Sequence, residues 1–366
     1  MKFSIQREAL LRPLTQVAGV VERRQTLPVL SNLLVRAAEN RLMLTGTDLE
    51  VELTASVGVE VERDGEITIP ARKLLDICKA LQDGTRLDLE FSADKATIRA
   101  GSGRFTLATL PANEFPVIED VEVGESVQIK QSDLKRIIEG TAFAMANQDV
   151  RYYLNGLLLE LREGMLRCVA TDGHRLAITD VDADLAVDDV RQMIIPRKGV
   201  LELQRLLDHD DEPITVQFGR SHVRVALDDG TFTSKLIDGK FPDYEAVVPM
   251  GADLVVEGER DDIRDALHRA AILSNEKYRG VRLELAPNQM RIVAHNPEQE
   301  EAVEEVEVTC EIDQLAVGFN VNYVLDALNA LETDQIQLCF KDANSSCLCK
   351  SPESNHARHV VMPLRL

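Results

Sequence analysis

The sequence predicts an α+β protein made of three repeated domains, each with two helices packed on antiparallel sheet. A helical stretch occurs three times at domain-sized intervals, and paired strand-like segments precede it in every copy. The 366 residues, with 45% hydrophobic content, are enough to bury three separate cores. We therefore expect domains at residues 1–120, 126–249 and 253–366.

The repeated helical stretch covers Ile69 to Leu81, Ile195 to Leu207 and Phe319 to Leu331, and its copies start 126 and 124 residues apart. In every copy the sixth, seventh and thirteenth positions are aliphatic and the eighth is acidic. Aliphatic residues at this spacing form one apolar stripe on a helix, with the acid on the opposite, solvated side. Intervals of this size indicate whole domains and not a solenoid.

Strand-like segments account for the rest of each repeat. Each third opens with a short strand followed by a further helix, and two strands joined by a hairpin turn come next. The hairpins end in loops that keep register across the repeats: Gly46-Thr47-Asp48, Ala170-Thr171-Asp172 and Ala294-His295-Asn296. Further strands close the units, ending in Phe115-Pro116 in the first and Phe241-Pro242 in the second.

Composition and motifs exclude several classes of protein. The apolar runs are a few residues long, far below the roughly 20 needed to cross a bilayer, and the N-terminus has no signal-peptide core. The six Cys lack paired CxxC spacing, which predicts a reduced, cytoplasmic protein. Because no P-loop, HExxH or GxSxG motif is present, we expect no enzyme activity, no cofactor and no metal.

Positive charge is concentrated on the predicted helices. The whole chain has a formal charge of −21, but Lys and Arg exceed Asp and Glu by six in the helical segments, which leaves −27 on the remainder. The segments are 7–24, 69–81, 127–140, 195–207, 260–273 and 319–331. If the helices share one face, that face can meet phosphates while the rest of the surface repels them. The alternative is that Lys and Arg simply fill solvated helix faces.

Two local patterns suggest other chemistry. Asp172 and His174 could form an acid-base pair and make residues 171–175 an enzyme site, although neighbouring side chains on a loop seldom face each other. The acidic turn Asp208–Glu212 could bind a metal, and Cys347 and Cys349 with Cys339 could ligate zinc. A solvated turn after a helix and strand cysteines without further ligands explain these patterns more simply.

Several long runs carry a family resemblance, and they are Leu44-Thr45-Gly46-Thr47-Asp48-Leu49-Glu50, Gln148 to Gly156, Ala170 to Leu176, Ile272 to Lys277 and Val361 to Leu366. They are similar to the beta sliding clamps, the beta subunits of bacterial DNA polymerase III, over the whole chain. The resemblance implies that three clamp domains form half of a closed ring, and that two copies joined head to tail encircle duplex DNA with their helices lining the hole. Such a ring would hold a polymerase on its template by topology, without sequence specificity, and would need a clamp loader to open it. The alternative is a scaffold that never meets DNA.

The resemblance also implies residues for DNA contact: Arg24, Arg72, Gln148, Tyr152 and Tyr153. Two adjacent tyrosines beside Gln148 can stack on or hydrogen-bond unpaired nucleotides. The other interpretation is one buried and one surface tyrosine on a strand.

A cleft for partner peptides is implied between the second and third domains. Its residues are Leu154, Thr171, Gly173, His174, Arg175, Leu176, Pro242, Val247, Val360, Val361, Met362, Pro363, Leu364 and Arg365. An apolar groove with a few polar groups suits a short extended peptide with Leu or Phe anchors. The expected partners are the polymerase alpha subunit, the clamp loader, and other polymerases and repair proteins with short linear motifs, but no membrane. The family has an Arg where this chain has Ala246, so one peptide contact differs here.

The joint between two copies is expected to have an apolar centre and a charged rim. Ile272 and Leu273 would pack on Phe105 and Leu107 of the second copy. The rim would place cations against acids, and its residues are Lys73, Arg104, Glu298, Glu300 and Glu301. Alternation on a strand would also allow Phe105 and Leu107 to be ordinary core residues.

Overall fold

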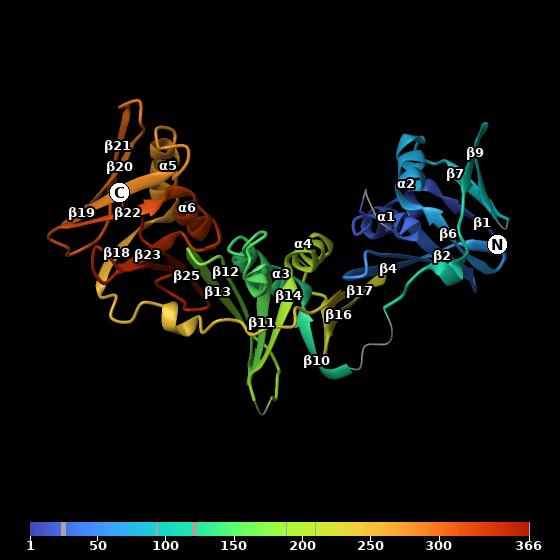
Figure 1. Ribbon diagram of the computed structural model, residues 1–366, viewed down its shortest axis with the longest axis horizontal. Coiled ribbons are helices and arrows are strands. Elements are labelled where there is room, and N and C mark those ends of the chain that lie inside the picture. Colours follow the sequence, from blue (N-terminus) through green and yellow to red (C-terminus); the bar gives the residue numbers. More distant parts are fainter. Residues whose placement is uncertain (23–26, 93, 119–122, 188, 209, 366) are drawn as a thin grey trace. The chain divides into compact units, whose positions relative to one another are not determined.

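The computed structural model describes residues 1–366 except 23–26, 93, 119–122, 188, 209 and 366 (Figure 1). In this described part, six α-helices and four antiparallel sheets are present, which confirms the predicted α+β class. The chain divides into two compact units, one formed by residues 1–132 and 201–236 and the other by residues 133–200 and 237–366.

The first unit contains two sheets. Five strands follow the order β5-β1-β7-β8-β9, with β1 (Lys2–Gln6), β5 (Glu60–Arg63), β7 (Arg86–Phe91), β8 (Lys95–Ala100) and β9 (Gly103–Ala108). Eight follow the order β10-β15-β16-β17-β4-β3-β2-β6, with β2 (Asn32–Ala38), β3 (Arg41–Thr47), β4 (Val51–Gly58), β6 (Gly65–Pro70), β10 (Val123–Lys130), β15 (Pro213–Gly219), β16 (His222–Leu227) and β17 (Gly230–Lys235). The pairing of β17 with β4 joins two repeats into this one sheet.

The second unit repeats this arrangement. Its eight-stranded sheet has the order β14-β11-β12-β13-β25-β24-β23-β18, with β11 (Gly156–Arg162), β12 (Met165–Thr171), β13 (Arg175–Asp182), β14 (Arg191–Pro196), β18 (Leu254–Glu259), β23 (Gln335–Phe340), β24 (Cys347–Lys350) and β25 (Ala357–Val361). A four-stranded sheet has the order β21-β20-β19-β22, with β19 (Gly280–Ala286), β20 (Gln289–His295), β21 (Glu301–Glu307) and β22 (Leu315–Asn320). The pairing of β25 with β13 joins the second and third repeats as β17 and β4 join the first and second.

Each of the six described helices begins at the residue that follows a strand. The helices are α1 (Arg7–Ala18), α2 (Ala71–Ala80), α3 (Gln131–Ala142), α4 (Arg197–Leu206), α5 (Arg260–Ala271) and α6 (Val321–Asn329). The repeated stretch is therefore helical only after its second residue, because its first two residues end β6, β14 or β22. Pro70 and Pro196 suit this junction, since proline lacks the N–H that the first turn of a helix leaves unpaired. At the third junction the Asn320 side chain accepts a hydrogen bond from the N–H of Asn322 at 3.0 Å.

The predicted apolar stripe is mostly buried. Leu74 is 2% exposed, Val200 1% and Val324 3%, so these positions face a core as expected. Leu201 departs from the pattern, because 44% of it is exposed. In the second unit α5 packs beside α6 and against β20 and β21, as Figure 1 shows. The structure contains no helix, among the residues described, that is long and apolar enough to span a membrane.

One core residue of β25 is a histidine. His359 is 1% exposed, and neither of its ring nitrogens has a hydrogen-bond partner among the described residues. Its ring meets Phe143 edge-on, with 5.5 Å between ring centroids. Burial lowers the pKa of His359 from 6.5 to about 4, because the charged imidazolium would lose its hydration.

Replacing His359 with Leu is expected to reduce the loss of unfolding free energy as the pH falls below 6.5. His359 becomes protonated near pH 6.5 in the unfolded chain and near pH 4 in the folded chain. The contribution of the neutral His359 to the unfolding free energy is therefore fully present above pH 6.5 and is lost as the pH falls from 6.5 toward 4. At pH 5 the folded protein should have lost about 2 kcal/mol of unfolding free energy through His359 alone. Urea denaturation at pH 7 and pH 5 measures the difference, with the exposed His356→Leu variant as control. If wild type and His359→Leu lose the same unfolding free energy between pH 7 and pH 5, His359 is not the cause of that loss.

Candidate docking site and nucleic-acid interface

The turn between β12 and β13 is held by its own hydrogen bonds. The Thr171 Oγ1 accepts the N–H of Gly173 at 3.1 Å and donates to the carbonyl of Arg175 at 2.6 Å. The Asp172 Oδ1 accepts the N–H groups of His174 and Arg175 at 2.9 and 3.1 Å. Gly173 has φ +89°, a conformation that favours glycine, and a Cβ there would lie 3.0 Å from the Arg151 guanidinium. The turn thus presents His174, which is exposed, on a rigid support.

Arg175 ties this turn to α6. Its Nε donates to Asp172 Oδ2 at 3.1 Å, and its Nη2 donates to the carbonyl of Phe143 at 2.7 Å. Its Nη1 donates to the carboxylate of Asp326. The guanidinium also lies 4.6 Å from the ring centroid of Tyr323. All three nitrogens have partners within the chain, so Arg175 supports the turn as well as lying in it.

An apolar cluster lies beside the turn and unites four of the predicted peptide-binding residues: Leu154, Leu176, Val247 and Val360. Phe241, Tyr244 and Leu348 pack in the same cluster. Sequence reasoning missed these three, although the repeated Phe-Pro pair pointed to Phe241. We call the cluster formed by these seven residues and their apolar neighbours the β13 cluster.

The remaining predicted peptide-binding residues lie around or away from the β13 cluster. Pro242 is exposed, and Met362 and Pro363 are half-buried. The N–H of Met362 donates to the carbonyl of His174 at 3.0 Å, which places it beside the turn. Val361 belongs to the core of the third repeat. Leu364 and Arg365 line a separate hollow of about 370 Å³ with Asn275, Tyr278, Gly280 and His295.

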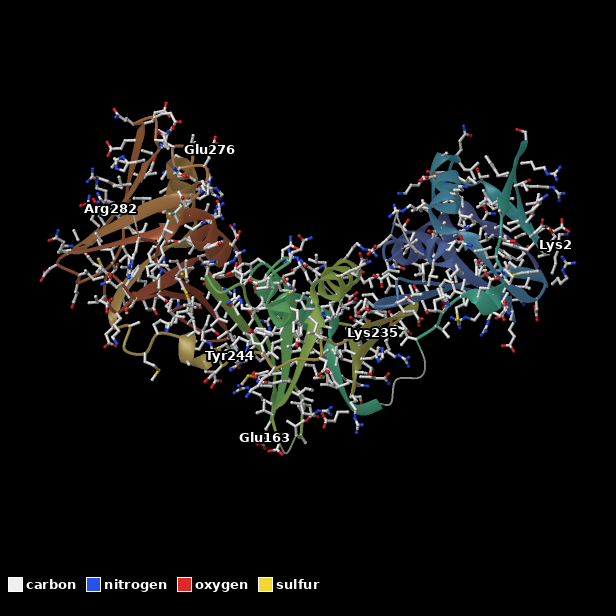
Figure 2. The ribbon with its side chains drawn as sticks, viewed as in Figure 1. Lys2, Glu163, Lys235, Tyr244, Glu276 and Arg282 are labelled. Atoms are coloured by element: carbon white, nitrogen blue, oxygen red, sulfur yellow. The ribbon has the colours of Figure 1, made fainter. Side chains whose placement is uncertain are left out.

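Tyr244 fixes the chain segment that supplies Pro242 and Val247 (Figure 2). Its hydroxyl donates to the carboxylate of Glu160, which is 0% exposed. The same hydroxyl accepts from Arg162 at 3.0 Å and from Arg167 at 3.2 Å. Burial, with the bond to Glu160, raises the pKa of Tyr244 to about 12, so it remains a donor at neutral pH.

The proposed nucleic-acid residues are held in different ways. Arg24 lies outside the described residues. Arg72 is exposed on α2 and donates from Nη2 to the carbonyl of Val21 at 2.9 Å. Gln148 is exposed at a turn with φ +59°.

The tyrosine pair lies on a 3₁₀ turn, Tyr152–Leu154, and not on a strand. Tyr152 is 57% exposed and donates its hydroxyl to the carbonyl of Asp238 at 3.2 Å. Tyr153 packs on the β13 cluster, and the two ring centroids are 5.7 Å apart at 70°. Tyr152 is thus the ring of the pair that is open for stacking.

The residues expected at the joint between copies lie at strand edges and on exposed helix positions. Phe105 and Leu107 are half-buried on β9, which is an edge strand of its sheet. Arg104, near the start of the same strand, is exposed. Ile272 is 76% exposed directly after α5, and Leu273 is half-buried. Lys73 on α2, and Glu298, Glu300 and Glu301 at the start of the edge strand β21, are exposed.

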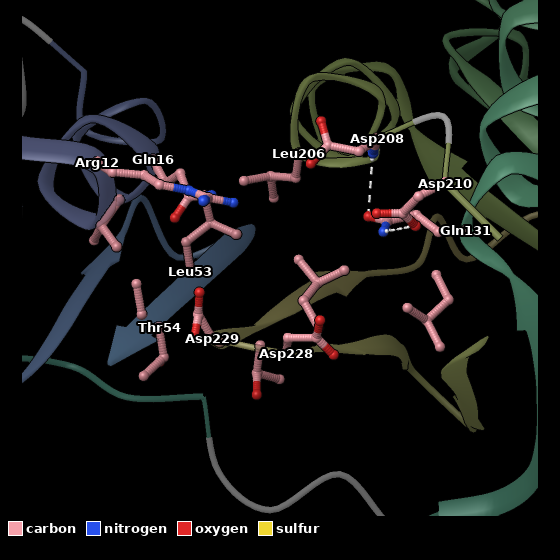
Figure 3. Close-up of a pocket in the computed structure, with 16 residues that line it drawn as sticks. Arg12, Gln16, Leu53, Thr54, Gln131, Leu206, Asp208, Asp210, Asp228 and Asp229 are labelled. Atoms are coloured by element: carbon pink, nitrogen blue, oxygen red, sulfur yellow. Dashed lines mark hydrogen bonds between the residues drawn. The ribbon is translucent and has the colours of Figure 1, made fainter. Parts of the chain in front are cut away.

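The alternative metal and enzyme sites lack the required geometry. In the acidic turn, the Asp210 carboxylate accepts from Gln131 at 2.8 Å (Figure 3). The Asp211 carboxylate accepts from Lys130 at 2.9 Å. His209 lies outside the described residues, and the described ones contain no group of His, Cys, Asp and Glu that could hold a metal ion. The Asp172 carboxylate faces backbone N–H groups and Arg175, while the His174 ring stacks on Tyr323 at 6.3 Å.

Three repeats of two helices on antiparallel sheet, linked by strand pairing from one repeat to the next, define a DNA-clamp architecture. Models of the N-terminal, central and C-terminal domains of the DNA polymerase III beta subunit match residues 1–119, 128–243 and 245–365. The chain belongs to this family, the beta sliding clamps, which are non-catalytic processivity factors of DNA replication.

Known members are similar over their full length. The beta sliding clamp of Pseudomonas aeruginosa is 54% identical over 367 residues and that of Escherichia coli 47%, with both chains covered completely. A crystal structure of the P. aeruginosa sliding clamp bound to griselimycin matches with a TM-score of 0.97, 54% identity and complete coverage of both chains.

Replacing Tyr244 with Phe is expected to lower the unfolding free energy by about 1–2 kcal/mol, because the buried Glu160 carboxylate loses a donor. Urea denaturation measures the change, and Tyr278→Phe, at a ring that is 54% exposed, is the control. Equal midpoints for the two variants would show that Tyr244 does not hold this segment.

Proposed function

We propose that two copies of this chain join head to tail into a ring that encircles duplex DNA, holds the replicative polymerase on its template and docks other replication and repair proteins. The three clamp domains are assigned to residues 1–120, 126–249 and 253–366. DNA is held by topology and without sequence specificity, and a clamp loader opens the ring.

The observation that carries this proposal is a joint that occurs twice within the chain. β4 pairs with β17 at the first joint, and β13 pairs with β25 at the second. By position in the repeat, β21 corresponds to β4 and β13, while β9 corresponds to β17 and β25. These two strands are sheet edges within the described chain, and an unpaired edge exposes N–H and C=O groups. Pairing β9 of one copy with β21 of another makes the third joint, and two such joints close a dimer.

The side chains near these edges support the same pairing. Ile272 and Leu273 supply an apolar surface that Phe105 and Leu107 of the second copy can cover. The rim is complementary in charge, with Lys73 and Arg104 on one side and Glu298, Glu300 and Glu301 on the other. A solvated ion-pair rim adds specificity more than affinity.

DNA contact is assigned to helix cations and to the tyrosine turn. Arg12 on α1 and Lys79 on α2 are exposed and make no ion pair among the described residues. By contrast, Arg264 and Arg269 on α5 are paired with acids. Unpaired cations bind phosphate without reading sequence. Arg24, Arg72, Gln148, Tyr152 and Tyr153 complete the proposed interface.

Partner docking is assigned to the β13 cluster with its surrounding residues. Aliphatic side chains of the cluster accept Leu or Phe anchors of a short extended peptide, and His174 offers a polar contact at the exposed turn. The proposed partners are the polymerase alpha subunit, the clamp loader, and other polymerases and repair proteins that carry short linear motifs. The wider contact set is Leu154, Thr171, Gly173, His174, Arg175, Leu176, Pro242, Val247, Val360, Val361, Met362, Pro363, Leu364 and Arg365.

The ring joint is tested by replacing Ile272 and Leu273 together with Ala. The doubly substituted chain should sediment as a monomer at a concentration where wild type is a dimer, because the apolar centre of the joint is removed. Met250→Ala is the matched control, since Met250 is 83% exposed but lies outside the joint. An unchanged dimer would remove this surface from the joint.

Encirclement is tested on circular and linear duplexes. After loading by a clamp loader onto a nicked circle, the protein should remain bound through gel filtration, and cutting the circle should release it within the same experiment. A scaffold or an ordinary DNA-binding protein would behave alike on both forms. Equal retention on the linear duplex would therefore refute topological binding.

Ala246 is exposed beside Glu245, whose carboxylate accepts from Arg162 at 2.9 Å. Ala246→Arg should raise affinity about threefold for a docking peptide that contains a carboxylate, because it adds a cation at the edge of the site. His174→Ala should weaken the same peptide. Fluorescence titration measures both, and a neutral peptide that gains as much from Ala246→Arg would refute the charge effect.

A further inference from the structure

The turn that presents His174 has a counterpart in the first unit, at residues 47–51. The Thr47 Oγ1 accepts the N–H of Leu49 at 3.1 Å and donates to the carbonyl of Val51 at 2.9 Å. The Asp48 Oδ1 accepts the N–H groups of Glu50 and Val51 at 2.9 and 2.7 Å. Each of these four bonds has its equivalent in the 171–175 turn, 124 residues later.

The strand beside the turn is also equivalent. The N–H of Lys235 donates to the carbonyl of Glu50 at 2.8 Å, as the N–H of Met362 donates to the carbonyl of His174 at 3.0 Å. Lys235 therefore occupies the place of Met362. Pro116 follows Phe115 as Pro242 follows Phe241, so it occupies the place of Pro242.

A hollow of about 190 Å³ lies at this second turn, and it is contained in one compact unit. Its lining includes the equivalents of Thr171, Gly173, Pro242 and Met362, and the full set is Thr47, Leu49, Pro116, Val117, Ile118, His222 and Lys235 (Lys235 is labelled in Figure 2). We call it the β4 hollow.

Leu49 makes the β4 hollow differ from the first docking site. Its φ of +78° is close to the +89° of Gly173, but leucine adopts this conformation only at a cost in strain. The strained leucine is also 37% exposed, and Val117 in the same lining is 59% exposed. A strained backbone that holds an apolar side chain toward solvent is typical of a functional position.

Lys235 is the charged group in the lining of the β4 hollow. The Lys235 ammonium is 3.9 Å from the Glu50 carboxylate, a loose contact between two largely exposed groups. The Nδ1 of His222 bonds Ser221 at 2.9 Å, whereas its Nε2 has no partner among the described residues. Burial, with Lys235 and Arg224 nearby, lowers the pKa of His222, so the ring is neutral at pH 7. The nearby Glu52 carboxylate already accepts the N–H of Ile118 at 2.9 Å.

We propose that the β4 hollow is a second docking site, which binds a short extended segment of a partner protein that carries a carboxylate next to an aliphatic side chain. The aliphatic side chain packs on Leu49 and Val117, and the carboxylate pairs with the Lys235 ammonium. This assignment rests on the proposed docking role of the β13 cluster, whose turn it repeats with different chemistry.

The test uses the full chain with methyl groups of Ile, Leu and Val labelled for NMR. The probe is acetyl-Ala-Leu-Asp-Ala-amide at about 5 mM, because a contact of this size is expected to bind in the millimolar range. Methyl signals of Leu49, Val117 and Ile118 should shift, and the shifts at equal concentration should be several-fold smaller with acetyl-Ala-Leu-Asn-Ala-amide. Lys235→Met introduces the residue type of the equivalent Met362, and it should make the shifts equal for the Asp and Asn peptides. Leu49→Gly, which matches Gly173, should reduce the shifts of Val117 with either peptide.

Three results would overturn the proposal: no shift at these methyls, equal shifts with both peptides, or the same shifts with inorganic phosphate alone, which would make the hollow a general anion site. Methyl groups of Leu176, Val247 and Val360 report the first docking site separately, through a probe with Leu and Phe anchors. If only those fail to respond, the proposed function of the β13 cluster is wrong while the β4 hollow stands on its own shifts.

Discussion

The rest of the structure depends on one constraint, the backbone pairing of a strand from one repeat with the last strand of the next repeat. It joins β4 to β17 and β13 to β25, so each eight-stranded sheet is shared by two repeats. Because hydrogen-bond register fixes both strands, the turn before β4 or β13 is held against the segment after β17 or β25. The 171–175 turn with the neighbouring Met362, and the 47–51 turn with the equivalent Lys235, take their positions from this pairing.

The same constraint explains why apolar side chains remain exposed on a chain with well-buried cores. A repeat that ends in an edge strand leaves backbone groups and nearby hydrophobic residues without partners, as at β9 and after α5. In the proposed ring, a second copy completes the series of joints and satisfies those groups. The acidic surface elsewhere repels a second chain, and in the proposed joint Lys73 and Arg104 lie opposite acidic residues.

Sequence reasoning predicted the repeats and the fold class, because helical periodicity and recurring loops are local signals. It began the repeated helix two residues too early, because Ile-Pro and Phe-Asn satisfy both a strand end and a helix start. It named Arg175 as a peptide contact but did not predict the bond from its guanidinium to Asp326, 151 residues away. Tyr244 was missed for the same reason, because its partners Glu160, Arg162 and Arg167 are remote in sequence. Leu201 fits the apolar stripe by spacing, yet 44% of it is exposed.

The central claim, that β9 of one chain pairs with β21 of another and that two such joints close, is tested most directly by cross-linking. Thr106 on β9 and Val303 on β21 are exposed, and all six native cysteines are buried, so Thr106→Cys with Val303→Cys introduces the accessible thiols. With a flexible bismaleimide, the doubly substituted chain should give covalent dimers and no higher multiples on a denaturing gel, because a closed dimer has no free end. A ladder of trimers and larger products, or no cross-link at all, would contradict the ring.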